Sequence, residues 1–212
     1  MSLERMQLQL DESALPEAAR RIITSGRQAI EAFQAVSHTD PVPGFHPGDF
    51  EEAWRWLVAV SGQLDHRSSP RCCEWGSGFA VVSALASLVG FQCTAIESDR
   101  RLFKASARWL HGLGAELEHL QGSFIPADFS SSWKESQAAA EMGSMSLWLD
   151  LEARFALEGK EEANAIFDLV YAYPWPGEET FVFELFDFSA RRGAWLLTFH
   201  GAADFRLHRK TD

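Results

Sequence analysis

Two acidic residues and a glycine-containing turn in this chain have the types and spacing to bind a nucleoside-bearing ligand. Residues 74–78 read Glu-Trp-Gly-Ser-Gly at the end of an apolar run, and Glu97 closes the next apolar run, 21 residues after Gly76. Glycines allow a strand to turn sharply into a helix, whose first N–H groups favour an anionic ligand group. An acid at this distance is placed to accept hydrogen bonds from both ribose hydroxyls. We therefore predict a pocket for a nucleoside-bearing cofactor. The alternatives are that the glycines only permit a tight turn and that Glu97 is an exposed acid.

The residues around the turn argue against a dinucleotide. A dinucleotide fingerprint would carry a third glycine at position 81, where this chain has Val81. Glu74, two residues before Gly76, would repel a pyrophosphate, but it suits a ligand with a positive amino or sulfonium group. The pattern thus favours a positively charged nucleoside ligand over NAD or FAD.

The elements that must position these residues alternate between short apolar runs and helical segments. Strands are predicted at 71–75, 92–97, about 116–120, 167–173 and 194–199, with helices at about 80–88 and 100–113 between the early ones. Such alternation predicts a mostly parallel, doubly wound α/β sheet of the Rossmann-like class. Residues 1–67 are predicted as an N-terminal helical cap, with helices from about Pro16 to Ala35 and from about Asp49. Residues 68–212 are predicted as the ligand-binding domain.

Residues 130–165 are too long for a simple connection and predict one or two inserted helices. From 130 to 188 the chain has twelve acidic and three basic residues. A solvated helix face explains this charge, and an acidic lid over a cationic substrate is the alternative.

The run Glu-x-Gly-x-Gly, with an acid closing the next strand, resembles the class I S-adenosylmethionine-dependent methyltransferases over about residues 68–200. The resemblance implies that Glu74 and the glycines surround the methionine end of S-adenosylmethionine, and that Glu97 grips its ribose. Ala80 stands at the third glycine of the family loop, and Ser123 stands where the family usually has an adenine-binding acid. The cofactor-binding residues expected from this resemblance are Glu74, Trp75, Gly76, Gly78, Glu97, Ser98, Ser123, Phe124 and Tyr171. The alternative for Trp75 is that its ring packs in the core or against the cap.

The loop after the predicted fourth strand would face the transferred methyl group in this family. Its sequence, Tyr173-Pro174-Trp175-Pro176, fixes the backbone and presets the directions of the aromatic rings. Tyr173 and Glu178 are the predicted catalytic residues, and Trp175 and His200 the predicted substrate-binding residues; the aromatic faces would suit an amine or ammonium substrate. The alternatives are a rigid packed turn, an acid that stabilises a helix start, and a structural histidine.

Composition limits the possible partners. The net charge of −11 disfavours nucleic acid, and no apolar run is long enough for a membrane span. Three cysteines without metal-ligand spacing predict no metal site and a reducing, cytoplasmic location. After residue 200 little chain remains, so the sheet is predicted to have a truncated C-terminal edge, covered by the N-terminal helices or by another subunit. The oligomeric state is not predicted.

We therefore expect transfer of a methyl group from S-adenosylmethionine to a small molecule or a protein side chain. The alternative is a non-catalytic protein that binds S-adenosylmethionine in a regulatory or interaction role.

Overall fold

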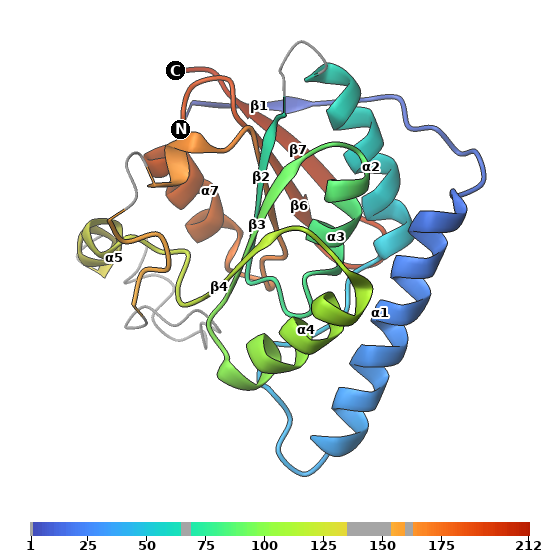
Figure 1. Ribbon diagram of the computed structural model, residues 1–212. Helices are drawn as coiled ribbons and strands as arrows, with labels where there is room; N and C mark the ends of the chain where they lie inside the picture. Colours follow the sequence, from blue (N-terminus) through green and yellow to red (C-terminus); the bar gives the residue numbers. More distant parts are fainter. Residues whose placement is uncertain (1, 65–68, 135–153, 160–162) are drawn as a thin grey trace.

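The chain forms one seven-stranded sheet with helices on both faces (Figure 1). The computed structural model describes residues 2–64, 69–134, 154–159 and 163–212. The strands are β1 (Leu3–Met6), β2 (Arg71–Trp75), β3 (Gln92–Glu97), β4 (Glu118–Gln121), β5 (Leu169–Ala172), β6 (Trp195–Phe199) and β7 (Phe205–Lys210).

The strand order is β1-β7-β6-β5-β2-β3-β4. The five strands from β4 to β6 are parallel, and β7 and β1 add an antiparallel edge. From β2 the chain builds outward through β3 to β4, then returns to place β5 on the other side of β2. Open α/β sheets bind ligands at the carboxyl ends of the strands beside such a reversal. The fold therefore predicts a site above the ends of β2 and β5.

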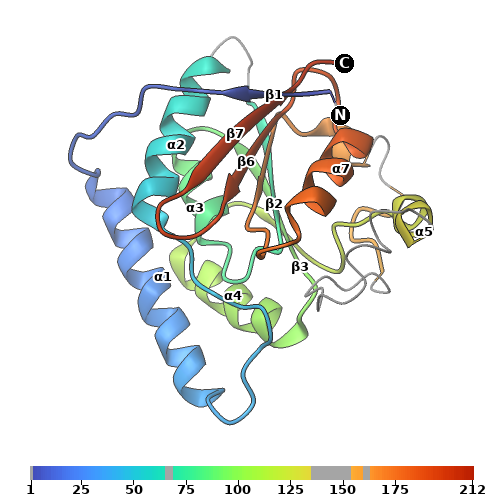
Figure 2. The same cartoon turned by 180° about the vertical axis from the view of Figure 1, so that it is seen from behind.

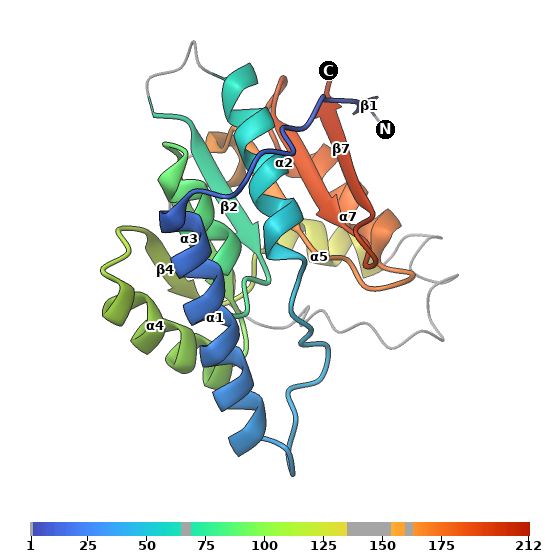
Figure 3. The same ribbon diagram turned by 90° about the vertical axis from the view of Figure 1, so that its right-hand side faces the viewer.

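In the part of the chain that the structure describes, four helices cover one face of the sheet and two cover the other (Figures 2 and 3). The first layer holds α1 (Glu17–Val36), α2 (Phe50–Gln63), α3 (Val81–Leu88) and α4 (Arg100–Leu113). The second layer holds α5 (Ala127–Lys134) and α7 (Glu179–Ser189), and a short 3-10 helix, η1 (Ala163–Ile166), leads into β5. Parallel strands buried on both faces explain the nearly continuous apolar sequences of β5 and β6.

Aspartate caps mark where α2 and α4 begin. Asp49 caps α2 by accepting a hydrogen bond from the Glu52 N–H at 3.1 Å. Asp99 caps α4 by accepting hydrogen bonds from the Arg101 and Leu102 N–H groups. Such caps satisfy backbone donors that the first helical turn leaves unpaired. Both caps also place the chain just before the helix beside the carboxyl edge of the sheet.

The predicted fold class is confirmed: this is a doubly wound, mostly parallel Rossmann-like sheet. The strands at 71–75 and 92–97 have their predicted bounds, and the others shift by a few residues. Most of the predicted insertion, residues 135–153 and 160–162, lies outside the described residues. Its described flanks form the end of α5, residues 154–159 and η1.

The C-terminal edge differs from the prediction. The short β7 is flanked by the N-terminal strand β1, with Leu3 opposite Lys210 and Met6 opposite Leu207. The free side of β7 is thus paired with an N-terminal strand of the same chain, an element that the sequence did not predict. The sequence of β1, Leu-Glu-Arg-Met, has charged residues at its centre and lacks the alternating pattern that signals a strand. Within the described ranges, no helix combines the length and apolar character needed to cross a bilayer.

Candidate functional site

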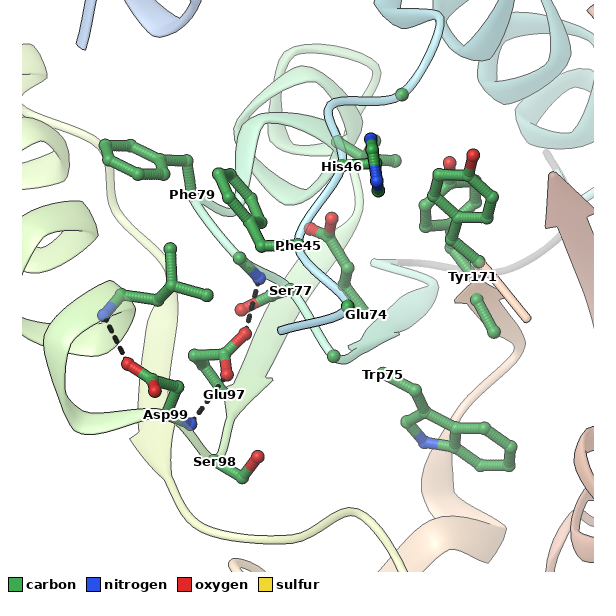
Figure 4. A pocket seen from close by; sticks show the side chains of 18 of the residues that line it. Phe45, His46, Glu74, Trp75, Ser77, Phe79, Glu97, Ser98, Asp99 and Tyr171 are labelled. Carbon is green, nitrogen blue, oxygen red and sulfur yellow. Dashed lines mark hydrogen bonds between the residues drawn. The ribbon is translucent and has the colours of Figure 1, made fainter. Parts of the chain in front are cut away.

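A cavity of about 710 Å³ lies at the carboxyl edge of the sheet, above β2, β3 and β5. Its wall is built from the turn after β2, the ends of β3 and β5, the segment after β4, and the N-terminal loop at 42–48. Figure 4 shows Glu74, Ser77 and Glu97 together at the centre of this wall. The predicted turn and the predicted sugar-binding acid therefore share one cavity.

The turn between β2 and α3 is held in an unusual backbone conformation. Gly76, Gly78 and Ala80 have φ values of +66°, +53° and +55°, all in the left-handed region. Glycine reaches this region without strain, whereas a residue with a Cβ reaches it at a cost. Ala80 thus occupies a glycine-like position with the conformation that a third glycine would have. Its N–H donates to the Ser77 carbonyl and closes the turn at 2.6 Å.

Gly78 is also required by close packing. A Cβ at this position would lie 2.7 Å from Cε2 of Phe45, a residue of the N-terminal loop. The Phe45 ring packs in turn against Phe33 of α1 and Phe79, with ring centroids 6.3 and 5.9 Å away. The N-terminal loop is therefore packed directly on the turn, and no side chain fits between them.

Glu97 is buried and holds the turn from the next strand. Its Oε2 accepts a hydrogen bond from the Gly78 N–H and its Oε1 from the Asp99 N–H, both at 2.7 Å. Burial raises the pKa of this carboxyl above its usual value, and the backbone hydrogen bonds oppose that shift. A carboxylate has about four acceptor sites. Two bonds to backbone donors thus leave capacity for hydroxyl donors of a ligand.

Glu74 lies on the same face of the sheet as Tyr171, its register partner on β5. Its Oε2 accepts hydrogen bonds from the Ser83 N–H at 2.8 Å and the Ser83 hydroxyl at 2.6 Å. Burial raises the pKa of Glu74 to about 7. Burial likewise raises the pKa of Tyr171, and the nearby Glu74 charge adds to the shift. A positive ligand group beside Glu74 would favour its ionised form.

The segment after β4 forms another side of the cavity. Ser123 is buried, and its hydroxyl accepts a hydrogen bond from the Ile125 N–H at 3.0 Å. A Cβ on Gly122, whose φ is +149°, would lie 2.7 Å from the Arg154 carbonyl oxygen. The Phe124 ring stacks on Trp75 with centroids 5.2 Å apart and planes 5° apart. The Trp75 side chain points away from Glu74, so its ring packs beneath this segment (Figure 4).

The opposite end of the cavity is made by two loops, 43–48 and 173–178, which we call the acceptor end. The Trp175 indole N–H donates to the Gly44 carbonyl at 2.9 Å, joining the loops. The His46 ring meets the Trp175 ring edge-to-face with centroids 4.9 Å apart. Glu178 is buried, and its Oε2 accepts a hydrogen bond from the Trp175 N–H at 3.1 Å. The aromatic-proline loop is thus fixed by the N-terminal loop on one side and by α7 on the other.

Most of the predicted site residues line this cavity, and one does not. The lining includes all nine predicted cofactor-binding residues, together with Tyr173, Trp175 and Glu178. His200 is not in the lining; its Nε2 lies 2.8 Å from the Thr198 hydroxyl, and its Nδ1 lies 3.9 Å from Glu179 Oε1. Burial lowers the pKa of His200, which favours the neutral ring.

Sequence reasoning gave no site role to several residues that line the cavity. Ser77 stands between the two glycines, and that position could have marked it; Asp99 follows the predicted sugar-binding acid by two residues. In the N-terminal loop only His46 was a candidate from sequence, as a residue that could close over the cofactor, and it lies in the lining. The described residues contain no group of three or more His, Cys, Asp or Glu side chains that could hold a metal ion.

The cavity fits a nucleoside by its own geometry. The Ser77 hydroxyl is buried, hydrogen-bonds to none of the described residues, and lies between Glu74 and Glu97 (Figure 4). A buried polar atom of this kind normally has a partner, which a ligand can supply. A Cβ at Gly76 would find only Phe124 nearby, at 3.9 Å, so the open space there lets a ligand approach the backbone.

Comparison with known proteins gives only distant likenesses. No model of a protein family matches the sequence, and no curated protein is significantly similar to it. Among solved structures, the O-methyltransferase TomG from Streptomyces achromogenes, in complex with SAM, is 14% identical with a TM-score of 0.49; the match covers 88% of this chain and 66% of that one.

An O-methyltransferase from Bacillus cereus, in complex with SAH, is 10% identical with a TM-score of 0.47, over 82% of this chain and 65% of that one. A methyltransferase from Geobacter sulfurreducens is 11% identical with a TM-score of 0.47, over 86% of this chain and 90% of that one. This chain therefore spans slightly less than two thirds of the first two structures.

Proposed function

We propose that this protein binds S-adenosylmethionine and transfers its methyl group to a small-molecule acceptor. The observation that carries the proposal is the grouping of Glu74, Ser77 and Glu97 around one cavity at the carboxyl edge of the sheet. Two buried acids and an unpartnered hydroxyl suit a ligand that is rich in hydroxyl donors and positively charged. A pyrophosphate would instead meet the carboxylate of Glu74.

Each residue has a role that its position supports. Glu97 would accept hydrogen bonds from the ribose hydroxyls, and Glu74 would pair with the positive methionine end. Ser98, Ser123 and Phe124 would surround the base, and the turn at 76–78 would present its backbone to the ligand. When bound, the cofactor supplies an electrophilic methyl group on a sulfonium.

The chain's own contribution to the reaction is mostly alignment. Tyr173 and Trp175 would form a rigid wall beside the reacting atoms, and Glu178 would accept a proton or orient the acceptor. Alignment of reacting groups can supply much of the rate acceleration for such a transfer. Tyr171, buried beside Glu74, would close the floor between the cofactor and the acceptor.

Isothermal titration with S-adenosylmethionine and S-adenosylhomocysteine tests the binding half of the proposal, with NADH as the matched control. We expect both sulfur ligands to bind and NADH to give no heat. Absence of heat and of a thermal shift at millimolar S-adenosylhomocysteine would contradict the proposal, as would preferential NADH binding. The catalytic half is tested by methyl transfer to a panel of small acceptors. Binding without turnover across that panel would favour a regulatory protein.

A further inference from the structure

The side chain of His200 is buried at the end of β6, and one of its ring nitrogens lacks a hydrogen bond to any described residue. The side chain is 5% exposed. Its Nε2 lies 2.8 Å from the Thr198 hydroxyl, whereas Nδ1 is buried and makes no hydrogen bond within the described ranges. A buried polar atom normally has a partner. The partner of Nδ1 must therefore come from the groups that face it.

The Thr198 hydroxyl determines which nitrogen carries the hydrogen in the neutral ring. This hydroxyl donates its single hydrogen to the Arg206 carbonyl at 3.3 Å, so towards the His200 ring it can only accept. The neutral ring must then carry its hydrogen on Nε2 and leave Nδ1 as an acceptor. Protonation of the ring adds the second hydrogen at Nδ1.

The carboxylate that faces Nδ1 belongs to Glu179, at the start of α7. Glu179 Oε1 lies 3.9 Å from Nδ1, which is beyond hydrogen-bond distance. In the neutral ring two acceptors face each other, and no hydrogen bond can form. In the protonated ring Nδ1–H is a donor, and an approach of about 1 Å would bring the pair to the length of a charge-assisted hydrogen bond. The contact thus has two states that differ by one proton.

The charged groups around His200 act on its ring in both directions. Burial lowers the pKa of His200, and the charge of Arg206 on β7 lowers it further, whereas Asp204 and Glu179 raise it. Arg206 and Asp204 form an ion pair at 2.6 Å, so their effects on the ring partly offset each other. Burial also lowers the pKa of the nearby His208, which favours its neutral form. The ring of His200 is therefore neutral at pH 7 and takes up a proton below pH 6.5.

Glu179 connects this contact to the acceptor end. Its other oxygen, Oε2, accepts a hydrogen bond from the Gly177 N–H at 2.7 Å. Gly177 belongs to the loop at 173–178, which lines the cavity at the acceptor end. Tyr173 of the same loop packs on Phe199 of β6, with ring centroids 4.7 Å apart. A shift of the Glu179 carboxylate towards the histidine ring would therefore move the loop at Gly177, while its first residue stays against β6.

We propose that His200 is a pH-sensitive positioning residue: when its ring is protonated, Nδ1–H donates to Glu179 and draws the start of α7 and the loop at 173–178 towards the end of β6. At neutral pH the ring is uncharged and this link is open. The proton comes from solvent and returns to it, so only an N–H bond forms and breaks. The inference does not depend on the proposed function, because it concerns how the loop is held and not what the cavity binds.

An NMR titration of the histidine rings in the full chain, between pH 4 and pH 8, tests the link to Glu179. The His200 signal is the one that H200N lacks, and we expect it to titrate below pH 6.5. E179Q keeps the shape of the side chain and removes its charge, so it should lower the midpoint by about half a unit to one unit. E184Q removes a charge from the same helix that does not act on His200, and should leave the midpoint within about 0.2 unit.

The backbone amide signal of Gly177 tests the effect on the loop, because a histidine with a merely structural role would not move it. Its chemical shift should change with the same midpoint as the His200 ring, and this change should vanish in H200N and in E179Q. The amide of Gly90, between α3 and β3, is the control and should show no such step.

Three results would overturn the inference. They are an Nδ1–H tautomer of His200 at neutral pH, read from its ring nitrogen shifts, an unchanged midpoint in E179Q, and a Gly177 signal that does not follow the His200 titration. If H200N does not fold, the ring signal is assigned by through-bond correlation to its own backbone. E179Q, whose native side chain is 34% exposed, then decides the outcome alone.

Discussion

The two ends of the cavity are built in different ways. At the cofactor end, the ligand-facing groups stand on strand ends and on one short turn, and Glu97 fixes them through bonds to backbone N–H groups. At the acceptor end, two loops that are far apart in sequence meet through the hydrogen bond from the Trp175 indole to Gly44 and through the contact between the Trp175 and His46 rings. One end depends on the sheet itself, and the other depends on how the N-terminal segment packs against it. We therefore expect the first to tolerate little change and the second to be adjustable.

Glu97 offers the most severe test of this difference. In E97A, we expect S-adenosylhomocysteine to bind about a hundredfold more weakly or worse. The variant loses the two hydrogen bonds that we propose between the Glu97 carboxylate and the ribose hydroxyls, and each bond to a charged group is worth about 1.5–3 kcal/mol. Isothermal titration measures the affinity, and thermal unfolding checks that the variant is folded. E179A is the control: Glu179 bonds to the Gly177 N–H and is not in the cavity lining, so its affinity should be nearly unchanged. The reverse pattern would contradict the assignment.

Gly78 tests whether the two ends are in contact. In G78A, the added Cβ would meet the Phe45 ring at 2.7 Å, and the φ of +53° would be strained. Together these effects should lower the free energy of unfolding by about 2–4 kcal/mol.

G90A is the matched control in a denaturant titration, because Gly90 also has a positive φ, +94°, with open space around it. It should lose only the backbone contribution, about 1–2 kcal/mol. In a double-mutant cycle with F45A, the extra loss of stability in G78A relative to G90A should disappear. Equal losses in G78A and G90A would mean that Phe45 does not pack on the turn.

The pH dependence of cofactor binding isolates Glu74. Because its pKa is raised to about 7, the neutral acid dominates below that pH and the carboxylate above it. If only the carboxylate form pairs with a positive group, the affinity for S-adenosylhomocysteine should rise by up to about tenfold between pH 6 and pH 8. Isothermal titration at several pH values measures this rise. E74Q should bind with an affinity that no longer follows this titration, and an unchanged profile in E74Q would show that another group is responsible.

Ionisation of Glu74, which should strengthen cofactor binding, should lower the free energy of unfolding of the ligand-free protein. The pKa of Glu74 in the folded state, about 7, exceeds its ordinary value of 4.5, so the folded state binds the proton more tightly than the unfolded state does. The fold is therefore most stable when Glu74 is neutral, and this contribution to stability is lost as the pH rises from about 4.5 to 7. Denaturant titrations at pH 5 and pH 8 should show a smaller decrease for E74Q than for the native chain. An equal decrease would exclude Glu74 as its source.

The smallest effect is expected at the link between the loops. W175F keeps an aromatic ring and removes the hydrogen bond to Gly44, which should cost about 1 kcal/mol of stability. S-adenosylhomocysteine binding should stay within about twofold, because this hydrogen bond lies at the other end of the cavity. W109F removes an indole hydrogen bond to Ser25, both residues lying outside the cavity lining, and is the control for a general loss of packing. A larger loss of cofactor binding than this would break the division into two ends.

The same division explains what could be predicted from sequence. The turn at 74–78 and Glu97 are local signals, since each stands where an apolar run ends and its role follows from the strand that precedes it. Parallel strands then bring both to one edge, so predicting the sheet also predicted their meeting. Asp99 and Ser77 were within reach of the same reasoning. Their types and positions beside the predicted residues are visible in the sequence.

The acceptor end was predicted only in part. Tyr173, Trp175 and Glu178 are adjacent in sequence and could be recognised as a group. His46, in the loop before α2, could be named as a residue that closes over the cofactor. Its contact with Trp175 and the role of Gly44 could not be predicted, because nothing local indicates that this loop folds over the end of β5. His200 was expected on the ligand side because it follows a strand, yet its ring is held against Thr198 and Glu179 outside the cavity lining.

The pairing of β1 with β7 has a consequence for the order in which the sheet forms during synthesis. The ribosome releases residues 3–6 long before residues 205–210, with which they form the antiparallel edge. Residues 3–6 therefore have no strand partner until β7 has been synthesised. The β1–β7 edge is among the last parts of the sheet to form. The central Glu4 and Arg5 charges of β1 suit that interval, because charged residues on an open strand discourage pairing with another nascent chain.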